Sequence, residues 1–459
     1  MNEVVKHVDK PQDESAEPVI FPVEAYISED YAKAERDKLW RKVWLQAGRV
    51  EDIPEVGNYI TYDIHADSVL IVRTDADTIK AYHNVCTHRG RRLVDTPPGQ
   101  RNARGKRTHF MCGFHGWNFD IEGHCHNIQQ QDDWQGKLTD ERSRLGKVLV
   151  ETWGGFIWIN LDPEAEPLRD YLEPAASMLD PFQLQNMRCR WRNWTVFDCN
   201  WKVALEAFDE TYHVRTTHPE FNAFGDFTGW ARPQGKHSHI GYDAPKGEED
   251  NSGLEENKAK LRLGIGDPRT STAQMQKYTW EGVNTNTTQT LVDVAQTLPE
   301  VLPEDTPPAE VLRYWLDTAR EIDAKRGVVW PQVDPAHVAA SGTAWQIFPN
   351  QQIGHAVNNM LCYQARPYGN NPDKCYFEVA VYELYPEGEA PETEWTYAAP
   401  EDFPHVLRQD FSNMAAVQEG MKNVGFRGVI PNPKSEGAVV SLHRNLARYM
   451  GTGTPTPLD

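Results

Sequence analysis

The sequence contains CTHRG at 86–90 and CGFHGW at 112–117, two short loops that each offer one cysteine and one histidine. Cysteine sulfur and histidine nitrogen both bind transition metals, so the four side chains are candidate ligands of one site. They could surround a single tetrahedral zinc ion. Alternatively, two cysteines could hold one iron atom and two histidines the other iron of a [2Fe–2S] cluster. The candidate ligands are Cys86, His88, Cys112 and His115.

The spacing of these ligands favours the two-iron cluster over zinc. Zinc sites commonly pair like residues, as in Cys-x2–4-Cys and His-x3–5-His, whereas each loop here mixes one cysteine with one histidine. A cluster with two ligand types needs that mixture, because each loop then gives one ligand to each iron. Gly90 and Gly116 leave room for the backbone beside the sulfur atoms. A structural zinc site is the less favoured alternative.

A second group of metal-binding side chains lies in NWKVALEAFDETYHVRTTH, residues 200–218. If residues 201–214 form a helix, Glu206, Glu210 and His213 share one face at positions i, i+4 and i+7. His218 follows just before a proline, where a helix must end or bend. Two histidines and a carboxylate, with open positions left over, form the facial triad of non-haem Fe(II) oxygenases.

The third ligand of such a triad should be a distant acid, and QDFSNMAAVQEGM (409–421) offers one. In a helix Asp410 shares a stripe with Met414, Val417 and Met421. A buried acid on an apolar stripe is costly unless it is paired or binds a metal ion. The rival acids Glu401, Asp402 and Glu419 lie off this stripe. A solvated position near the start of the helix is the alternative for Asp410.

With YHNVC before the first loop and an acid eight residues before Gln418-x-Gly420, the chain resembles the large (alpha) subunits of Rieske non-haem iron ring-hydroxylating oxygenases. The resemblance covers most of the chain. It implies a [2Fe–2S] Rieske cluster on the ligands of the two loops. It also implies a mononuclear Fe(II) held by His213, His218 and Asp410.

The resemblance further implies an acid that bridges the two metal centres across a subunit boundary, three residues before the first iron histidine. That position is Glu210. The adjacent Asp209 is the second candidate. It ranks below Glu210 because, on a helix, its side chain would point about 100° away from that of Glu210. An acid of this kind hydrogen-bonds the outer nitrogen of a ligand from each centre, which fixes the ring orientation and tunes the metal.

The sequence favours an α+β fold. Short β-rich runs separated by turns predict an antiparallel β domain, the Rieske domain, over residues 46–162. An arm and a helix (24–45, N-capped by Ser28) should precede it and pack on the catalytic domain. Residues 163–459 mix strands and helices without βαβ alternation, and the resemblance implies a helix-grip (START/Bet v1-like) catalytic domain. Helices are expected at 309–325, 402–422 and 436–450, strands at 191–201, 344–350 and 374–386, and irregular structure at 232–300.

The segment between the two loops is longer than is usual for this family, and its proline, glycine and arginine content predicts an enlarged surface loop. Arg89, Arg91 and Arg92 could dock an acidic electron carrier, or they could form local salt bridges. No G-x-G-x-x-G follows a strand, so electrons from NAD(P)H should arrive through a separate flavin reductase or ferredoxin.

Composition sets broader limits. The chain has 459 residues, a net charge of −20 and 39% hydrophobic residues, which fits packed domains and argues against nucleic-acid binding. No apolar run reaches the roughly 18 residues of a membrane span. An odd number of cysteines and no secretory signal at the start of the sequence favour a reducing cytoplasm.

The expected function is that of a terminal oxygenase component that activates O2 at iron and hydroxylates a small apolar, aromatic or polycyclic substrate, by cis-dihydroxylation. Monohydroxylation or O- or N-demethylation is the alternative. A Rieske electron-transfer protein without catalysis, or a zinc-stabilised binding module, is a weaker one. A homotrimer (α3), or α3β3 with a small subunit, is expected. The aromatic residues considered for the pocket are Phe208, Phe221, Phe224, Phe227, Trp230, Trp345 and Phe348.

Overall fold

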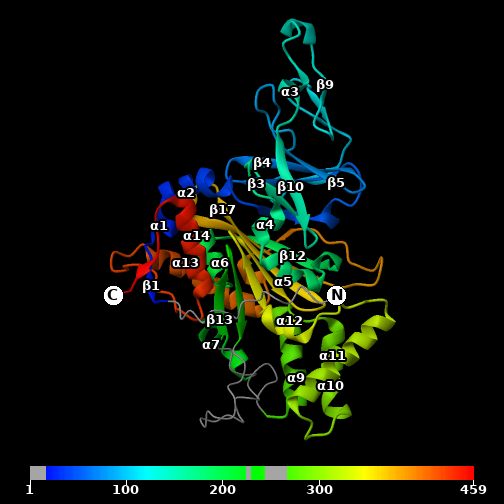
Figure 1. The fold of residues 1–459 in the computed structure, drawn as a ribbon, viewed down its shortest axis with the longest axis vertical. Helices are drawn as coiled ribbons and strands as arrows, with labels where there is room; N and C mark the ends of the chain where they lie inside the picture. The colour runs from blue at the N-terminus through cyan, green and yellow to red at the C-terminus, as the bar shows by residue number, and fades with distance from the viewer. Residues whose placement is uncertain (1–16, 224–228, 243–265, 459) are drawn as a thin grey trace.

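A computed structural model describes residues 17–223, 229–242 and 266–458 of the chain. Figure 1 shows an elongated β-rich part at the top of the view, drawn in blue and cyan, above a broader part in which helices surround a large sheet. No helix among the described residues is both long enough and apolar enough to cross a membrane. This mixed α+β architecture, with two large sheets, two small ones and separate helices among the described residues, is the one expected from the sequence.

The β-rich part contains an antiparallel sheet of seven strands among the described residues, in the order β2-β11-β10-β5-β4-β3-β6. A smaller sheet, β7-β8-β9, extends from it and carries the second cysteine–histidine loop. The strands are β2 (Leu45–Arg49), β3 (Asn58–Ile64), β4 (Asp67–Asp75), β5 (Thr78–His83), β6 (Arg104–Lys106), β7 (His109–Met111), β8 (Asn118–Asp120), β9 (Cys125–Asn127), β10 (Lys147–Trp153) and β11 (Phe156–Asn160), and a short helix, α3 (Asp140–Ser143), precedes β10.

The broader part is built on an eight-stranded sheet in the order β13-β14-β15-β16-β17-β18-β12-β19, which is antiparallel except where β19 joins β12. Alternate residues of each strand face opposite sides. Tyr363 of β17 and Phe377 of β18 lie on the same face of the sheet. Phe208 packs on this face and stacks on both rings. The strands are β12 (Arg188–Phe197), β13 (Gly229–Gln234), β14 (His237–Tyr242), β15 (Ala344–Ile347), β16 (Gln351–His355), β17 (Asn359–Tyr368), β18 (Asn371–Glu383) and β19 (Thr396–Tyr397).

Helices cover this sheet and extend below it in the view of Figure 1. The predicted helices at 309–325, 402–422 and 436–450 are confirmed within a few residues, and so are the three predicted strands. The helices are α4 (Leu168–Leu172), α5 (Ala175–Leu179), α6 (Trp201–Glu206), α7 (Val214–Thr217), α9 (Pro268–Tyr278), α10 (Gln289–Val301), α11 (Pro308–Lys325), α12 (Pro335–Ala340), α13 (His405–Met421) and α14 (Gly437–Met450).

The expectation of irregular structure over 232–300 was wrong for the described residues in this range. Strands β13 and β14 form a hairpin, and α9 and α10 follow in the same range. Readable signals were present: Asp267 caps α9 by accepting a hydrogen bond from the Arg269 N–H, with Pro268 at the first helical position. Proline there and an acidic cap are start signals of a helix, but the polar composition of the region concealed them.

The single helix expected over 24–45 was also wrong. The chain forms α1 (Glu24–Ile27), α2 (Glu29–Glu35) and a π-helical turn (Arg36–Trp40), and then enters β2. Ser28 does act as an N-cap, because its Oγ accepts from the Tyr31 N–H. Its extended backbone separates α1 from α2. A short two-stranded sheet joins β1 (Val19–Ile20) to β20 (Thr456–Pro457), near the two ends of the described chain.

The long segment between the two cysteine–histidine loops is more than the surface loop that the sequence suggested. It contains β6, and Arg101 from this segment is 8% exposed and binds Glu378 of β18. Arg366 of β17 binds the same carboxylate and also donates to the backbone carbonyl of Asp63 in β3. A carboxylate buried between two guanidinium groups is fully paired. The segment between the two loops therefore anchors the β-rich part on the eight-stranded sheet.

Candidate metal centres

The two cysteine–histidine loops have the same backbone geometry. In the first, the Cys86 N–H donates to Arg91 O at 2.8 Å and the Gly90 N–H donates to Cys86 O at 2.9 Å. In the second, Cys112 N–H donates to Trp117 O at 2.8 Å and Gly116 N–H to Cys112 O at 3.0 Å. Both glycines have positive φ, +77° and +71°, which other residues rarely adopt. Each loop is thus a closed turn that presents its cysteine and histidine on one side.

The loops bring like ligands together. Cys86 and Cys112 are each 2% exposed and lie within hydrogen-bonding reach of one another. The ring centroids of His88 and His115 lie 4.6 Å apart, and the His88 ring stacks on that of Trp117. No three of these four side chains place their ligand atoms within 4.8 Å of one another, as a single ion would require. Separate sulfur and nitrogen pairs fit the two irons of a Rieske cluster and not one tetrahedral zinc ion.

Backbone N–H groups point at both sulfur atoms. Burial raises the pKa of the Cys86 thiol to about 11, although the N–H groups of His88 and Arg89 oppose this rise. Burial also opposes ionisation of Cys112, but the N–H groups of Phe114 and His115 outweigh it and lower the pKa of that thiol. Hydrogen bonds to sulfur favour the thiolate, which is the form that ligates metal.

The second group of predicted ligands also comes together. The ligand atoms of His213, His218 and Asp410 lie within 4.8 Å of one another. Asp410 Oδ1 is 2.9 Å from His218 Nε2 and 3.2 Å from His213 Nε2. This oxygen is buried, yet it makes no hydrogen bond within the described residues. Three inward-facing ligands and an unsatisfied carboxylate oxygen fit a single divalent metal ion.

The electrostatics of this triad also suit a cation. Burial lowers the pKa of His213, but the carboxylates of Asp410 and Glu210 outweigh burial and raise it to about 10. Burial likewise raises the pKa of Asp410, and His213 and His218 lower it overall. A divalent ion would take the place of these protons and neutralise the same carboxylates.

The continuous helix expected over 201–214 was wrong. Helix α6 ends at Glu206, and the chain turns through Ala207–Tyr212 before α7 begins at Val214. His213 and His218 therefore flank the short helix α7 at its two ends, and helical spacing does not explain their meeting. The apolar stripe expected on α13 was also only half right: Asp410 and Met414 are buried, but Val417 is 43% exposed.

Glu210 and Asp209 occupy different environments. A carboxylate oxygen of Glu210 contacts His213 Nδ1, and another accepts from the His213 N–H at 3.1 Å. Asp209 is fully buried, and neither of its oxygens has a hydrogen-bond partner among the described residues. Burial first, and then the charges of Glu206 and Glu210, raise the pKa of Asp209 well above its usual range. Of the two candidates, Glu210 contacts an iron-ligand candidate directly.

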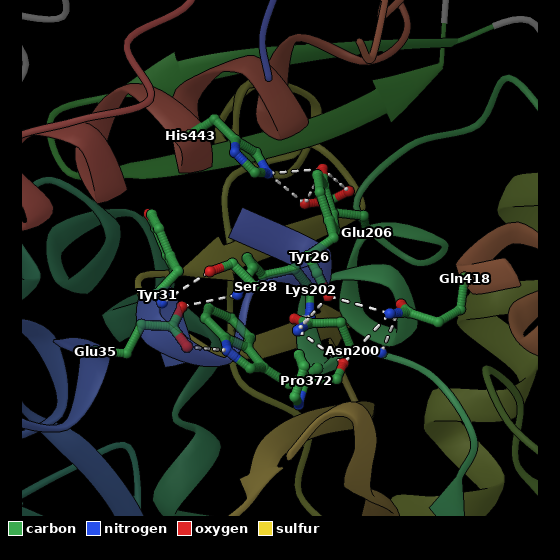
Figure 2. Close-up of polar contacts among 11 residues, drawn as sticks. Tyr26, Ser28, Tyr31, Glu35, Asn200, Lys202, Glu206, Pro372, Gln418 and His443 are labelled. Atoms are coloured by element: carbon green, nitrogen blue, oxygen red, sulfur yellow. Dashed lines mark hydrogen bonds and ion pairs between the residues drawn. The ribbon is translucent and has the colours of Figure 1, made fainter. Parts of the chain in front are cut away.

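A buried polar network holds α6 in place (Figure 2). The Tyr26 hydroxyl contacts Glu206 at 2.8 Å and His443 at 2.7 Å, so that three separate elements meet there. Lys202 pairs with Glu35 of α2 at 2.7 Å, with both side chains at most 1% exposed. These contacts join the N-terminal helices and α14 to the helix that leads into the ligand loop.

Helix α13 joins this network through Gln418, at the right of Figure 2. Gln418 accepts from the Asn200 N–H at 3.0 Å and donates to Tyr26 O at 3.1 Å. Asn200 also N-caps α6, through the Lys202 N–H. Because α13 carries Asp410 and α6 leads to the histidines, these amide contacts set how the two ligand-bearing segments face one another. The sequence analysis used Gln418 only as a motif residue.

Two further residues that the sequence analysis missed support His218. Its Nδ1 lies 2.8 Å from Gln409 Oε1, and the Gln409 amide in turn reaches Glu220 at 3.1 Å. Their positions were the only sequence signal, because Gln409 directly precedes Asp410 and Glu220 follows His218 by two residues.

The aromatic pocket candidates are scattered. Phe221 lies beside His218, with ring centroids 6.0 Å apart, and Tyr278 packs against Phe221. Phe208 packs in the core with Tyr363 and Phe377. On the other face of the sheet Trp345 stacks on His239, which also contacts Trp230, and Phe348 packs on Tyr449. Phe224 and Phe227 lie outside the described residues.

The arginines near the first loop are mostly paired. Arg91 binds Asp95 at 2.6 Å, and Arg92 lies 3.5 Å from Asp63. Arg89 lies over the ring of Phe114, 5.2 Å from its centre. Local salt bridges thus account for two of the three arginines.

Comparison with known proteins shows the family to which the chain belongs. The family model "Rieske [2Fe-2S] domain" matches residues 43–146, and "Ring hydroxylating alpha subunit (catalytic domain)" matches residues 151–452. A glycine betaine monooxygenase oxygenase subunit from Chromohalobacter salexigens is 32% identical over 187 residues, 40% of each chain. The large oxygenase component of a naphthalene 1,2-dioxygenase system from Pseudomonas putida is 33% identical over 41% of this chain and 42% of its own. The matched part thus spans well under two thirds of these relatives.

Solved structures share the fold over nearly the whole chain. A quaternary ammonium Rieske monooxygenase bound to L-carnitine superposes with a TM-score of 0.62 at 17% identity, covering 95% of this chain and 97% of that one. Naphthalene 1,2-dioxygenase gives 0.60 at 19% identity, covering 95% and 93%. The family implies a Rieske cluster and a mononuclear iron, and the residues described above fit both. The chain belongs to the ring-hydroxylating alpha subunit family, with a Rieske [2Fe–2S] domain preceding the catalytic domain.

Proposed function

We propose that this chain is the terminal oxygenase component of an electron-transfer system that oxidises an organic substrate with O2. Cys86 and Cys112 would hold one iron of the Rieske cluster and His88 and His115 the other. His213, His218 and Asp410 would hold the mononuclear iron. The observation that carries the proposal is the buried, unsatisfied Oδ1 of Asp410 facing two histidine Nε2 atoms.

The two metal groups supply one-electron transfer and the reduction of O2, and the chain's own residues prepare the site for them. Nearly complete burial of His218 and Asp410 keeps bulk water from their ligand atoms. Glu210 accepts from the outer nitrogen of His213 and so directs Nε2 toward the metal position. We propose Glu210 as the bridging acid between the centres, with Asp209 as the second candidate.

For the reaction, we infer monooxygenation of a substrate with a methylated ammonium group. One oxygen atom of O2 would enter a carbon–hydrogen bond, and the other would leave as water after uptake of two electrons and two protons. The support is that glycine betaine and carnitine monooxygenase oxygenase subunits are among the proteins similar to this chain.

Cis-dihydroxylation of an aromatic ring is the second candidate. It is supported by the similarity to the naphthalene dioxygenase component. The rings of Phe221 and Tyr278, packed edge to face beside His218, also offer apolar surface near the iron ligands.

The domain division that we propose is an N-terminal segment (1–45), a Rieske domain (46–162) and a catalytic domain (163–459). Electrons would come from a ferredoxin or flavin reductase. A homotrimer would pair the cluster of one subunit with the iron of its neighbour. Exposed apolar side chains beside both centres suit such a contact: Phe114 is 57% exposed in the second cluster loop, and Tyr212 is 61% exposed beside His213.

The decisive experiment supplies the purified protein with a reductase, a ferredoxin and NADH, and offers methylated ammonium compounds and aromatic hydrocarbons in parallel. Mass analysis of the products identifies the reaction. Gain of one oxygen followed by loss of a methyl group as aldehyde would support monooxygenation, and gain of two oxygens would identify dihydroxylation. A protein that forms no oxygenated product while consuming no O2 with any donor would contradict the oxygenase proposal.

A further inference from the structure

The two histidines of the triad are supported from behind by different chemistry. His213 Nδ1 faces the carboxylate of Glu210. His218 Nδ1 instead faces a carboxamide oxygen, Gln409 Oε1, at 2.8 Å. A carboxylate accepts hydrogen bonds on either oxygen, but an amide accepts on one end and donates on the other. The amide end that faces His218 therefore matters.

The tautomer of His218 depends on that choice. A neutral imidazole carries its proton on one nitrogen and a lone pair on the other. Nε2 of His218 points at Asp410 and must offer its lone pair to bind metal, so Nδ1 must carry the proton and donate it. The amide oxygen of Gln409 accepts a hydrogen bond from this N–H. A reversed amide would present its NH2 group to Nδ1, and the proton of His218 would then move to Nε2.

Glu220 removes this ambiguity. Both of its carboxylate oxygens lie 3.1 Å from Gln409 Nε2. A carboxylate at neutral pH only accepts hydrogen bonds, so only the NH2 end of Gln409 can face it. His405, one turn earlier on α13, also contacts this carboxylate, with its Nε2 3.2 Å from Glu220 Oε1. Glu220 belongs to the helical turn Pro219–Ala223, which begins directly after His218. The ligand His218 and Glu220, which orients its support, therefore lie on one continuous short segment.

We propose that Glu220 is a positioning residue for the mononuclear iron: it orients the Gln409 amide, and the Gln409 amide holds His218 in the tautomer that binds metal. The inference rests on the proposed iron site and adds residues outside its ligand set. It predicts that a carboxylate linked to the ligand His218 through two successive hydrogen bonds controls metal affinity without touching the metal or the substrate.

The test is equilibrium binding of Fe(II) to protein that retains its cluster but has been depleted of mononuclear iron. Glu220→Gln replaces the carboxylate with a group that can donate or accept, so the Gln409 amide is no longer oriented. Loss of such a support typically weakens metal binding about ten- to a hundred-fold. The EPR signal of the ferrous nitrosyl adduct should broaden or split, because His218 is no longer held in one geometry.

The exchanged pair, Gln409→Glu together with Glu220→Gln, is the sharpest variant. It keeps the charge and the hydrogen-bonding atoms, but the carboxylate now faces His218 and the amide faces the carboxylate. The pair should recover most of the wild-type affinity. Gln409→Met, which cannot accept the His218 proton, should bind iron as weakly as Glu220→Gln. Glu419→Gln is the matched control, because Glu419 is an exposed acid on α13, the helix of Gln409, and forms an ion pair with Lys422.

The proposal is overturned if Glu220→Gln binds Fe(II) as tightly as wild type and Glu419→Gln. It is also overturned if the exchanged pair binds as weakly as Glu220→Gln alone, because a structural defect would not be repaired by moving the charge. An unchanged cluster absorption spectrum shows that each variant is folded. If wild-type protein binds no iron beyond the cluster, the proposed function itself fails, and that result is distinct from either outcome above.

Discussion

Arg101 of the Rieske domain binds Glu378 of the catalytic sheet through two hydrogen bonds, 2.9 Å from Nε to Oε1 and 2.7 Å from Nη2 to Oε2. Both side chains are 2% exposed. Paired, charge-assisted hydrogen bonds of this kind fix orientation as well as distance. The contact joins the segment between the two cluster loops to the sheet that underlies the iron site, so it fixes how the two domains of one chain sit together.

Replacing Arg101 with Met should destabilise the protein, because Glu378 would keep only Arg366 as a partner in a buried position. Removing one partner of a buried ion pair costs about 3–5 kcal/mol, and the remaining arginine places the expected loss at the low end. Chemical denaturation followed by tryptophan fluorescence measures it. Arg104→Met is the control, because Arg104 is 44% exposed and lies 3.6 Å from an exposed partner. Equal losses for the two variants would contradict this account.

The same contact predicts a pH dependence of stability. Burial raises the pKa of Glu378, but Arg101 and Arg366 outweigh it and lower the pKa to about 2. An unperturbed glutamate has a pKa of about 4.3. The stabilisation is therefore complete above about pH 4.3 and is lost as the pH falls toward 2. Glu378→Gln should flatten this part of the stability–pH curve, and a curve identical to that of wild type would count against the ion pair as its source.

The Rieske ligands predict colour and composition. Cys112→Ala should abolish the brown absorption and the acid-labile sulfide, because one iron of the cluster loses a ligand. Cys125→Ser is the matched control, since this nearby cysteine lies outside both loops and should leave the spectrum intact. Metal analysis and visible absorption measure both. A colourless wild-type protein that contains zinc would end the cluster assignment.

Replacing a proposed iron ligand should abolish substrate oxidation without affecting the Rieske cluster. His213→Ala should abolish substrate oxidation and the ferrous nitrosyl EPR signal while leaving the cluster spectrum unchanged, because the two sets of ligands are distinct. Asp410→Ala should behave alike, since it removes the oxygen that faces both histidines. Turnover at the wild-type rate by either variant would refute the triad.

Glu210 and Asp209 can be told apart by electron transfer. Glu210→Gln should leave both metals bound and slow electron transfer from cluster to iron, because the contact with His213 Nδ1 changes from a charged to a neutral one. Asp209→Asn should leave that rate near wild type, because neither Asp209 oxygen has a hydrogen-bond partner among the described residues. Rapid single-turnover kinetics measure both. A slow Asp209→Asn and a normal Glu210→Gln would exchange the two roles.

Much of both centres was readable in the residue order. The mixed cysteine and histidine loops pointed to a two-iron cluster because their ligand types are set by local spacing alone. The eight-residue interval from Asp410 to Gln418, a feature of the family resemblance, pointed to Asp410 among several acids as the proposed third iron ligand. Ser28 and the helices at 309–325 and 436–450 were found for the same reason: caps and apolar periodicity act over a few residues.

The tertiary structure decided what depends on distant groups. Helix α6 ends at Glu206 and His213 lies in a turn, so the meeting of His213 with Asp410 comes from the packing of α13 and not from helical spacing. Arg101 is buried because Glu378, 277 residues away, supplies its charge partner. Glu220 and Gln409 lie 189 residues apart and carry no motif. Residue order determines which atoms can bind a metal, but the compensation of buried charge determines which of them meet.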